Sequence, residues 1–137
     1  MRQEGDKLIN ELLSTNIIVP GGAKLLHNII CVRKKTGDMR ACVDMRYSNK
    51  YMHKCQYPIP RLDQFLYKTR GYRYYSVLDL PAAFHQFLLH SSQRDLFGIY
   101  YRGKCYRYQT LPQGCKNSPM LMQEKLSSLF DEDLISW

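Results

Sequence analysis

Residues 74–80, Tyr-Tyr-Ser-Val-Leu-Asp-Leu, are the stretch on which the interpretation of the whole chain depends. Their β-branched and aromatic side chains favour a buried strand, in which successive side chains point to opposite faces. Asp79 would share a face with Tyr75 and Val77, and a buried carboxylate is costly unless a partner or a metal ion neutralises it. Asp79 would therefore either cap the turn that enters Pro81 or serve as a metal ligand at the end of the strand. The stretch alone leaves both interpretations open.

The composition indicates one folded domain that favours a polyanionic partner. The chain has 137 residues, of which 45% are hydrophobic and 12% aromatic, so it is long enough for a single core and too apolar for an intrinsically disordered chain. Its net charge is +8, and residues 33–73 carry eleven lysines or arginines against three acids. Such an excess favours nucleic acid, although a solvated basic face would have the same composition.

Cysteine and hydropathy patterns exclude several other classes of protein. Five cysteines and four histidines are scattered without the paired spacing of a zinc site, and the odd number of cysteines argues against a disulfide framework. We therefore expect reduced core thiols in an intracellular protein, cytoplasmic or nuclear. No apolar run approaches the roughly 20 residues of a membrane span, and no signal peptide precedes the polar start, so we expect no membrane association.

Helices and two-stranded ribbons alternate without a βαβ rhythm, which is typical of the α+β class. Helices are expected where apolar residues recur at helical spacing, over residues 3–14, 60–68 and from 118 onward. Strands are expected in pairs around turn residues, at 26–32, 39–45, 96–101 and 104–109. The remaining segments are expected to be a short extended piece at 17–20, irregular chain at 46–57 and a loop at 111–114.

Two of these helices have a proline in the first turn, Pro60 in one and Pro119, after a Ser118 cap, in the other. Their buried faces are expected to consist of Leu62, Phe65 and Leu66 in the first and of Met122, Leu126, Leu129 and Phe130 in the second. Residues 131–137 end on apolar side chains that nothing downstream covers, which we interpret as a domain cut short.

Three motifs have to be considered together. The first, within residues 32–50, contains Arg-Lys-Lys-Thr-Gly-Asp and Val-Asp-Met-Arg; the second, within 75–86, is Val-Leu-Asp-Leu-Pro-Ala-Ala-Phe. The third, within 111–119, is Leu-Pro-Gln-Gly followed by Lys-Asn-Ser-Pro. In this order and at this spacing the chain resembles the reverse transcriptases of retroviruses and LTR retrotransposons along nearly its whole length.

The resemblance implies a partial right-hand polymerase in a single partial domain. Fingers would comprise about residues 1–54 and 87–111, and palm about residues 55–86 and 112–137. The complete enzyme would be an RNA-directed DNA polymerase that adds deoxynucleotides by phosphoryl transfer with two Mg²⁺ ions. Its partners would be an RNA or DNA template-primer, deoxynucleoside triphosphates, and the missing palm and thumb segment of a polyprotein.

The resemblance also implies roles for individual residues. Asp79 matches the family's first metal-binding aspartate, which makes it the candidate catalytic residue. Nucleotide binding is implied for Lys34 or Lys35, Arg40, Ala82, Ala83, Phe84 and Gln113. Phe84 would block a ribose 2′-hydroxyl, with a core phenylalanine as the alternative. Template binding is implied for Asp44, Arg46, Asn49, Lys50 and Gly114. For Asp44 and Asn49, a local turn or an ion pair with Arg46 is an equal alternative.

Some positions depart from the family pattern: Met45, Ser48, Pro81 and Cys115. The larger departure is the absence of the Tyr-x-Asp-Asp hairpin, since no two aspartates are adjacent in this chain and Asp131 and Asp133 are not in such a turn. One carboxylate does not hold two divalent ions, so we expect little or no polymerase activity from these residues alone. Two alternatives are a non-catalytic nucleic-acid-binding remnant of a retroelement and a gene fragment that does not fold stably.

Overall fold

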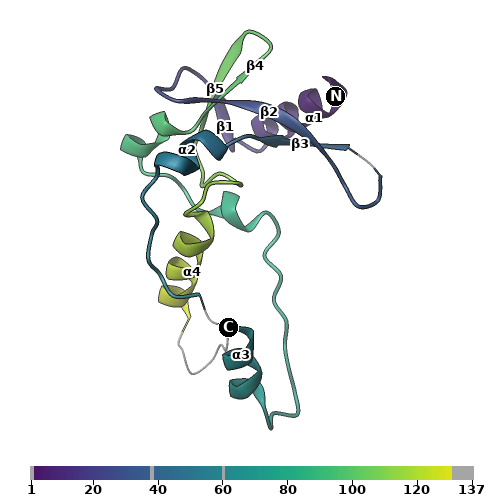
Figure 1. Ribbon diagram of the computed structural model, residues 1–137, viewed down its shortest axis with the longest axis vertical. Helices are drawn as coiled ribbons and strands as arrows, with labels where there is room; N and C mark the ends of the chain where they lie inside the picture. Colours follow the sequence, from purple (N-terminus) through teal and green to yellow (C-terminus); the bar gives the residue numbers. More distant parts are fainter. Residues whose placement is uncertain (1, 38, 60, 131–137) are drawn as a thin grey trace.

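A five-stranded mixed sheet is the largest element of the computed structural model, which describes residues 2–37, 39–59 and 61–130 (Figure 1). The strand order is β1-β5-β4-β2-β3. β2–β3 and β4–β5 are antiparallel hairpins, and parallel pairing of Leu26–Asn28 with Gly98–Tyr100 joins them. The strands are β1 (Ile18–Pro20), β2 (Leu26–Arg33), β3 (Met39–Val43), β4 (Gly98–Tyr101) and β5 (Lys104–Tyr108).

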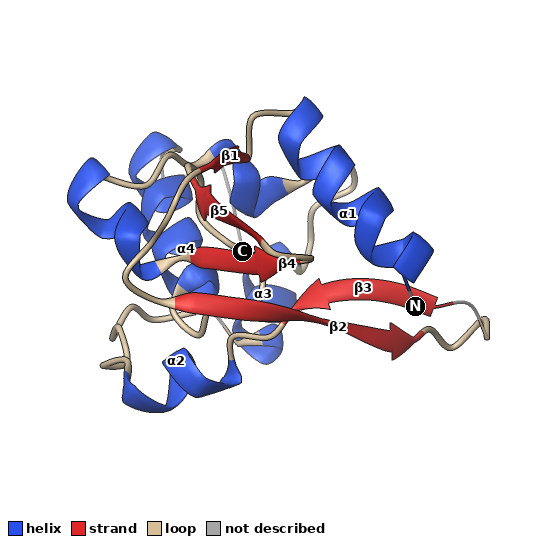
Figure 2. Cartoon of the chain, turned by 90° about the horizontal axis from the view of Figure 1, so that it is seen from above, coloured by secondary structure: helices blue, strands red, loops and turns tan. Residues whose placement is uncertain are grey.

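Helix α1 (Arg2–Ser14) lies across the sheet (Figure 2) and buries Ile9 and Leu12 against it. These side chains share the core with Ile18, Ile99 and Tyr108, one from each of three strands. The remaining helical elements are α2 (Arg46–Tyr51), α3 (Leu62–Thr69), α4 (Ser118–Leu129) and the short 3₁₀ helices η1 (Ala83–Gln86) and η2 (Ser91–Leu96). The expected α+β class, the first helix and both hairpins are confirmed.

Helix α2 corrects the expectation that residues 46–57 are irregular; only the part after Tyr51 lacks regular structure. Its six residues are too few to form a stable helix by themselves, so tertiary contacts must hold it. The His27 Nδ1 lies 2.8 Å from the Gly98 carbonyl oxygen, and its Nε2 lies 2.5 Å from the Ser48 hydroxyl. A carbonyl only accepts, so Nδ1 donates to Gly98 and Nε2 accepts from Ser48. This buried chain of bonds ties α2 to β2 and β4.

The expected buried strand at residues 74–80 is wrong, because this segment is extended without strand pairing. Tyr74 is 92% exposed, Val77 91% and Leu78 77%. A strand needs a neighbour to satisfy its backbone N–H and C=O groups, and none of the five described strands lies against this segment. The apolar residues therefore remain in solvent, and Asp79 is exposed with them.

The expected buried faces of the last two helices are also largely wrong. Helix α3 buries no residue, and Leu62 is 72% exposed. In α4 Leu126 is buried, whereas Leu129 is 71% exposed. Pro60, the expected start of the first of these helices, is outside the described residues. The start of α4 is confirmed, but the N-cap position is Asn117, and the Ser118 hydroxyl instead donates to the Pro112 carbonyl at 2.8 Å.

The five cysteines are free thiols, and one of them, Cys115, is buried while the other four are half-buried. The expectation of core thiols therefore applies to Cys115 alone. Within the part of the chain that the structure describes, no helix is both long and apolar enough to span a membrane. Residues 131–137, including Asp131 and Asp133, lie outside the described residues.

Candidate nucleotide and template site

The β2–β3 hairpin carries the basic residues that the family resemblance assigns to the nucleotide. Its tip projects beyond the rest of the sheet (Figures 1 and 2). The Gly37 N–H donates to the Lys34 carbonyl at 3.0 Å, and the φ of Gly37 is 93°, a value that favours glycine. Lys34, Lys35 and Arg40 are all exposed, so their charges are accessible to an anionic ligand.

Asp44 and Arg46 form a bidentate ion pair at the start of α2. The Arg46 Nε and one terminal nitrogen donate to the two Asp44 carboxylate oxygens at 2.8 and 2.7 Å, and the Arg46 N–H donates to the same carboxylate at 3.1 Å. These hydrogen bonds lower the pKa of Asp44 to about 2. The ion-pair interpretation of Asp44 is confirmed, and contact with the template stays a prediction for both residues.

The Asn49 side chain forms hydrogen bonds across 65 residues of chain, and not the local turn or the pairing with Arg46 that was its alternative role. Contact of Asn49 with the template stays a prediction. The Asn49 Nδ2 donates to the Gly114 carbonyl at 2.8 Å, and its Oδ1 accepts the Lys116 N–H at 2.7 Å. Both ends of the amide are thus used to hold the loop that contains Gln113. Lys50, the next residue, is exposed and available to solvent.

Two more side chains continue this connection, and sequence reasoning assigned no role to either. The Lys116 Nζ donates to the Met52 carbonyl at 2.6 Å. The Asn117 Nδ2 donates to the His53 carbonyl at 2.7 Å, and its Oδ1 accepts the Cys55 N–H at 3.0 Å. We call Asn49, Lys116 and Asn117 together the amide clamp, after the side-chain amides of the two asparagines. The position of Lys116 and Asn117 inside the third motif, as its Lys-Asn pair, was the sequence signal that could have identified these two residues.

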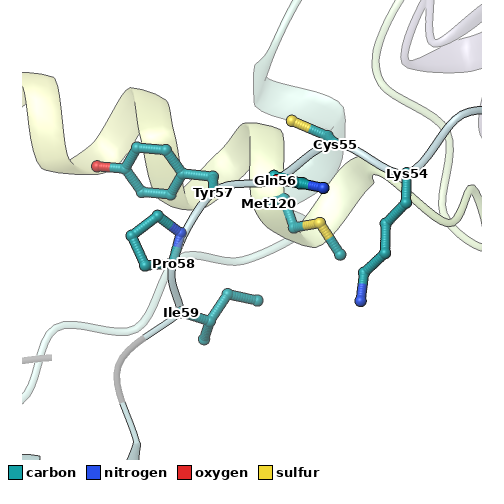
Figure 3. Close-up of a pocket in the computed structure, with 7 residues that line it drawn as sticks. All are labelled: Lys54, Cys55, Gln56, Tyr57, Pro58, Ile59 and Met120. Atoms are coloured by element: carbon teal, nitrogen blue, oxygen red, sulfur yellow. The ribbon is translucent and has the colours of Figure 1, made fainter.

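The amide clamp holds the chain after α2 beside α4, where the two enclose an open pocket of about 550 Å³ (Figure 3). In Figure 3 the extended chain crosses the start of α4 at Met120. The pocket is lined by Lys54, Cys55, Gln56, Tyr57, Pro58, Ile59 and Met120. It lies at the expected boundary between fingers and palm, near residue 54.

The loop at 111–114, which has no regular structure as expected, presents Gln113 to solvent. Gly114 has a φ of 94°, in the left-handed region. A Cβ there would meet the Val43 carbonyl oxygen at 3.7 Å, an ordinary contact, so the backbone angle and not close packing is what favours glycine. Template binding at Gly114 stays a prediction.

The turn after Asp79 has a left-handed residue that is not glycine. Ala82 has φ 49° and ψ 40°, and η1 begins directly after it. The Gln86 Nε2 donates to the Pro81 carbonyl at 2.8 Å and closes the turn. Phe84 is half-buried in η1, which packs against α4, so the ring is neither fully in the core nor free.

Asp79, the candidate metal ligand, belongs to no cluster of metal-binding side chains in the part of the chain that the structure describes. Within the described residues no group of three or more His, Cys, Asp or Glu side chains is placed to hold a metal ion. Each Mg²⁺ requires about six oxygen ligands, several of them from water or phosphate. One exposed carboxylate does not fit a pair of such ions, so the described residues by themselves do not form a site for two Mg²⁺ ions.

Substitution of Asn49 by alanine is expected to lower the free energy of unfolding by about 2 kcal/mol, because it removes two hydrogen bonds and leaves the Lys116 N–H without this partner. Urea unfolding followed by circular dichroism measures the loss. The matched control is Asn10→Ala, an exposed asparagine of α1, for which we expect a change within about 0.5 kcal/mol. Equal effects of the two substitutions would contradict the role of the clamp.

Stability is expected to fall as the pH is lowered from 7 to 5.5, and less so in His85→Gln. Burial in η1, where the ring stacks on Tyr108, lowers the pKa of His85 below its ordinary value of 6.5. Near pH 6.5 the unfolded chain therefore binds a proton at His85 more readily than the folded chain does. The free energy of unfolding falls as the pH is lowered through this value. The midpoint of thermal unfolding at the two pH values measures this. The exposed histidine substitution His53→Gln should keep the wild-type difference.

Solved structures of similar fold include viral polymerases. A foamy viral protease-reverse transcriptase in complex with dsDNA matches with a TM-score of 0.80 and 23% identity, over 96% of this chain and 28% of that one. The same enzyme in complex with an RNA/DNA hybrid matches with a TM-score of 0.74 and 19% identity, over 94% and 18%. The fold is therefore that of the fingers and palm region of a nucleic-acid polymerase.

The chain belongs to the reverse transcriptase (RNA-dependent DNA polymerase) family, whose sequence model matches residues 32–133. It is 28% identical over 128 residues to the retrovirus-related Pol polyprotein from transposon 412 of Drosophila melanogaster, covering 89% of this chain and 10% of that protein. The polyprotein from transposon opus of the same fly is 31% identical, with 98% and 14% covered. The Tf2-3 transposon polyprotein of Schizosaccharomyces pombe is 27% identical, with 90% and 9% covered. The chain thus spans about a tenth of the length of these relatives.

Proposed function

We propose that this chain is the part of a retroelement RNA-directed DNA polymerase that holds the template and the incoming deoxynucleotide. Fingers would comprise about residues 1–54 and 87–111, and palm about 55–86 and 112–137. The observation that carries the proposal is the amide clamp, which joins the basic fingers helix α2 to the Gln113 loop. Two segments that the family resemblance assigns to template and nucleotide are thereby held together.

The incoming triphosphate would be gripped from the exposed hairpin. Lys34 or Lys35 supplies a flexible ammonium, and Arg40 a planar guanidinium that can bind two phosphate oxygens at once. The turn at Ala82 supports an additional contact, since a left-handed residue followed by helical ones directs successive N–H groups toward one side. Phe84 would stand beside the sugar, and Gln113 would contact the nucleotide from its exposed loop.

Asp79 would supply one carboxylate to the Mg²⁺ ions that such polymerases use to polarise the phosphates. The other ligands would come from side chains outside the described residues. The template-primer would run over α2, where Arg46 and Lys50 are exposed and Asn49 fixes the adjacent Gly114. The viral structures of similar fold hold dsDNA or an RNA/DNA hybrid, which supports a duplex partner for this chain.

The test combines binding and primer extension with the purified chain. We expect a fluorescently labelled RNA/DNA primer–template to bind with an affinity that falls steeply with salt. We expect no extension of the primer, because one carboxylate does not complete the metal site. Absence of binding at low salt would overturn the proposal. Mg²⁺-dependent extension that disappears in Asp79→Asn would overturn the incomplete site and confirm the polymerase.

A non-catalytic nucleic-acid-binding module is the second candidate. The exposure of Asp79, without further metal-binding side chains among the described residues, favours it. In that case Asp79→Asn, introduced into a longer protein that contains the complete palm, would leave every property unchanged, while removal of the hairpin charges would abolish binding.

A further inference from the structure

Helix α2 exposes two tyrosines side by side on the surface. Tyr47 is 67% exposed and Tyr51 64% exposed. Being four residues apart, they lie on the same face of the helix, and their ring centroids are 5.0 Å apart with an angle of 57° between the planes. The Lys50 Nζ lies 5.6 Å from the Tyr51 ring centroid, within reach of a cation–π contact.

The opposite face of α2 is fixed to the body of the protein, which makes this pair of rings a rigid surface. Met45 and Ser48 are buried, and Asn49 is bonded at both ends of its amide to the Gln113 loop. The tyrosines take no part in this packing. Because their helix is already held in place, little further ordering would be needed when a ligand stacks on them.

The charge around the pair fits a polyanion. Asp44 pairs with Arg46, but residues 45–62 contain no aspartate or glutamate to offset Lys50 and Lys54. Lys50 and Lys54 are exposed on or just after α2, and the paired Arg46 is exposed beside them. Exposed aromatic rings among lysines and arginines are what proteins use to bind single-stranded nucleic acid, with bases on the rings and phosphates on the cations.

We propose that Tyr47 and Tyr51 form a stacking platform for unpaired bases of a single-stranded template. This inference rests on the proposed function, since that function brings the template over α2. It adds a mode of contact that the basic residues do not provide, because a base stacks through its flat face and no particular sequence is required. Unpaired template therefore binds more tightly than the same length of bare sugar-phosphate backbone.

The experiment compares two labelled primer–templates with the purified chain by fluorescence anisotropy. Both carry the same duplex and an overhang of the same length, with ordinary bases in one and abasic sites in the other. The variants are the double substitutions Tyr47→Ala with Tyr51→Ala, and Tyr47→Phe with Tyr51→Phe. The matched control is Tyr67→Ala, a tyrosine that is 80% exposed on α3 and stands next to Lys68.

We expect the double alanine variant to bind the overhang with bases about 5- to 100-fold more weakly than the wild type, and the abasic overhang with unchanged affinity. The double phenylalanine variant should retain wild-type binding, because it keeps the rings, and Tyr67→Ala should bind as the wild type does. Thermal unfolding by circular dichroism verifies that the variants are folded.

Three outcomes would overturn the platform. The alanine variant could bind both overhangs as the wild type does, or lose the same factor on both, or the phenylalanine variant could lose as much as alanine. The first shows no role, the second a role without bases, and the third a role of the hydroxyls. Absence of wild-type binding to either overhang is a separate result, which overturns the proposed function itself.

Discussion

Replacement of Lys34, Lys35 and Arg40 by glutamine is expected to weaken nucleic-acid binding roughly 100-fold or more at 0.1 M salt. The three side chains are exposed on the hairpin that projects from the sheet, so they can reach phosphates without rearrangement of the core. Each phosphate that a cation neutralises releases about 0.7 to 0.9 of a counterion. The negative slope of log K against log salt should therefore become shallower by about 2 to 3 in the triple variant.

The matched control removes the same three charges elsewhere. Lys7, Lys24 and Lys125 are exposed on α1, on the chain before β2 and on α4, outside both the hairpin and α2. Their replacement by glutamine lowers the net charge from +8 to +5, as the hairpin variant does, because 8 − 3 = 5. Anisotropy titrations at about 50 to 300 mM salt compare the salt slopes of the hairpin variant and the control variant. Equal slopes would show that net charge and not the hairpin determines binding.

Substitution of Gly98 by valine is expected to destabilise the fold by about 3 kcal/mol or more, enough to unfold a marginal domain. Gly98 lies where β4 meets β2 in the parallel pairing that joins the two hairpins. A Cβ at this position would lie 2.6 Å from the Ala23 Cβ and 2.9 Å from the Leu25 carbonyl oxygen. Both neighbours belong to or adjoin the backbone, so neither can move away as the end of a flexible side chain would.

The destabilisation at Gly98 should extend to α2. The Gly98 carbonyl accepts a hydrogen bond from His27 Nδ1, and the same His27 ring bonds to Ser48 of α2 through Nε2. Urea unfolding followed by circular dichroism measures the change. Gly22→Ala is the control, since a Cβ there meets nothing within 4 Å. We expect that variant to change stability by no more than about 1 kcal/mol, with stabilisation the favoured direction. A folded Gly98→Val protein of wild-type stability would contradict the close approach of β4 and β2.

The elements that the sequence predicted correctly have local causes. The spacing of Ile9 and Leu12 determines which face of α1 is buried, and the Lys34–Gly37 turn and Arg102-Gly103 determine where the two hairpins reverse. The site residues could not be predicted from local patterns, because their roles came from the family resemblance. No pattern in the chain indicated that Asn49 contacts Gly114. Hydrogen bonds between residues far apart in sequence leave no periodic signal.

The stretch at residues 74–80 shows what the sequence determines and what depends on tertiary structure. Its composition alone favoured a strand, and its motif, with those around it, indicated the polymerase family and Asp79 as a metal ligand. Whether a β-favouring segment becomes a strand depends on a partner for its backbone groups, which no described strand provides. Conversely, α2 exists because His27, Ser48 and Asn49 connect it to distant segments. The sequence by itself determined the family and the hairpins, and tertiary contacts decided which short segments are ordered.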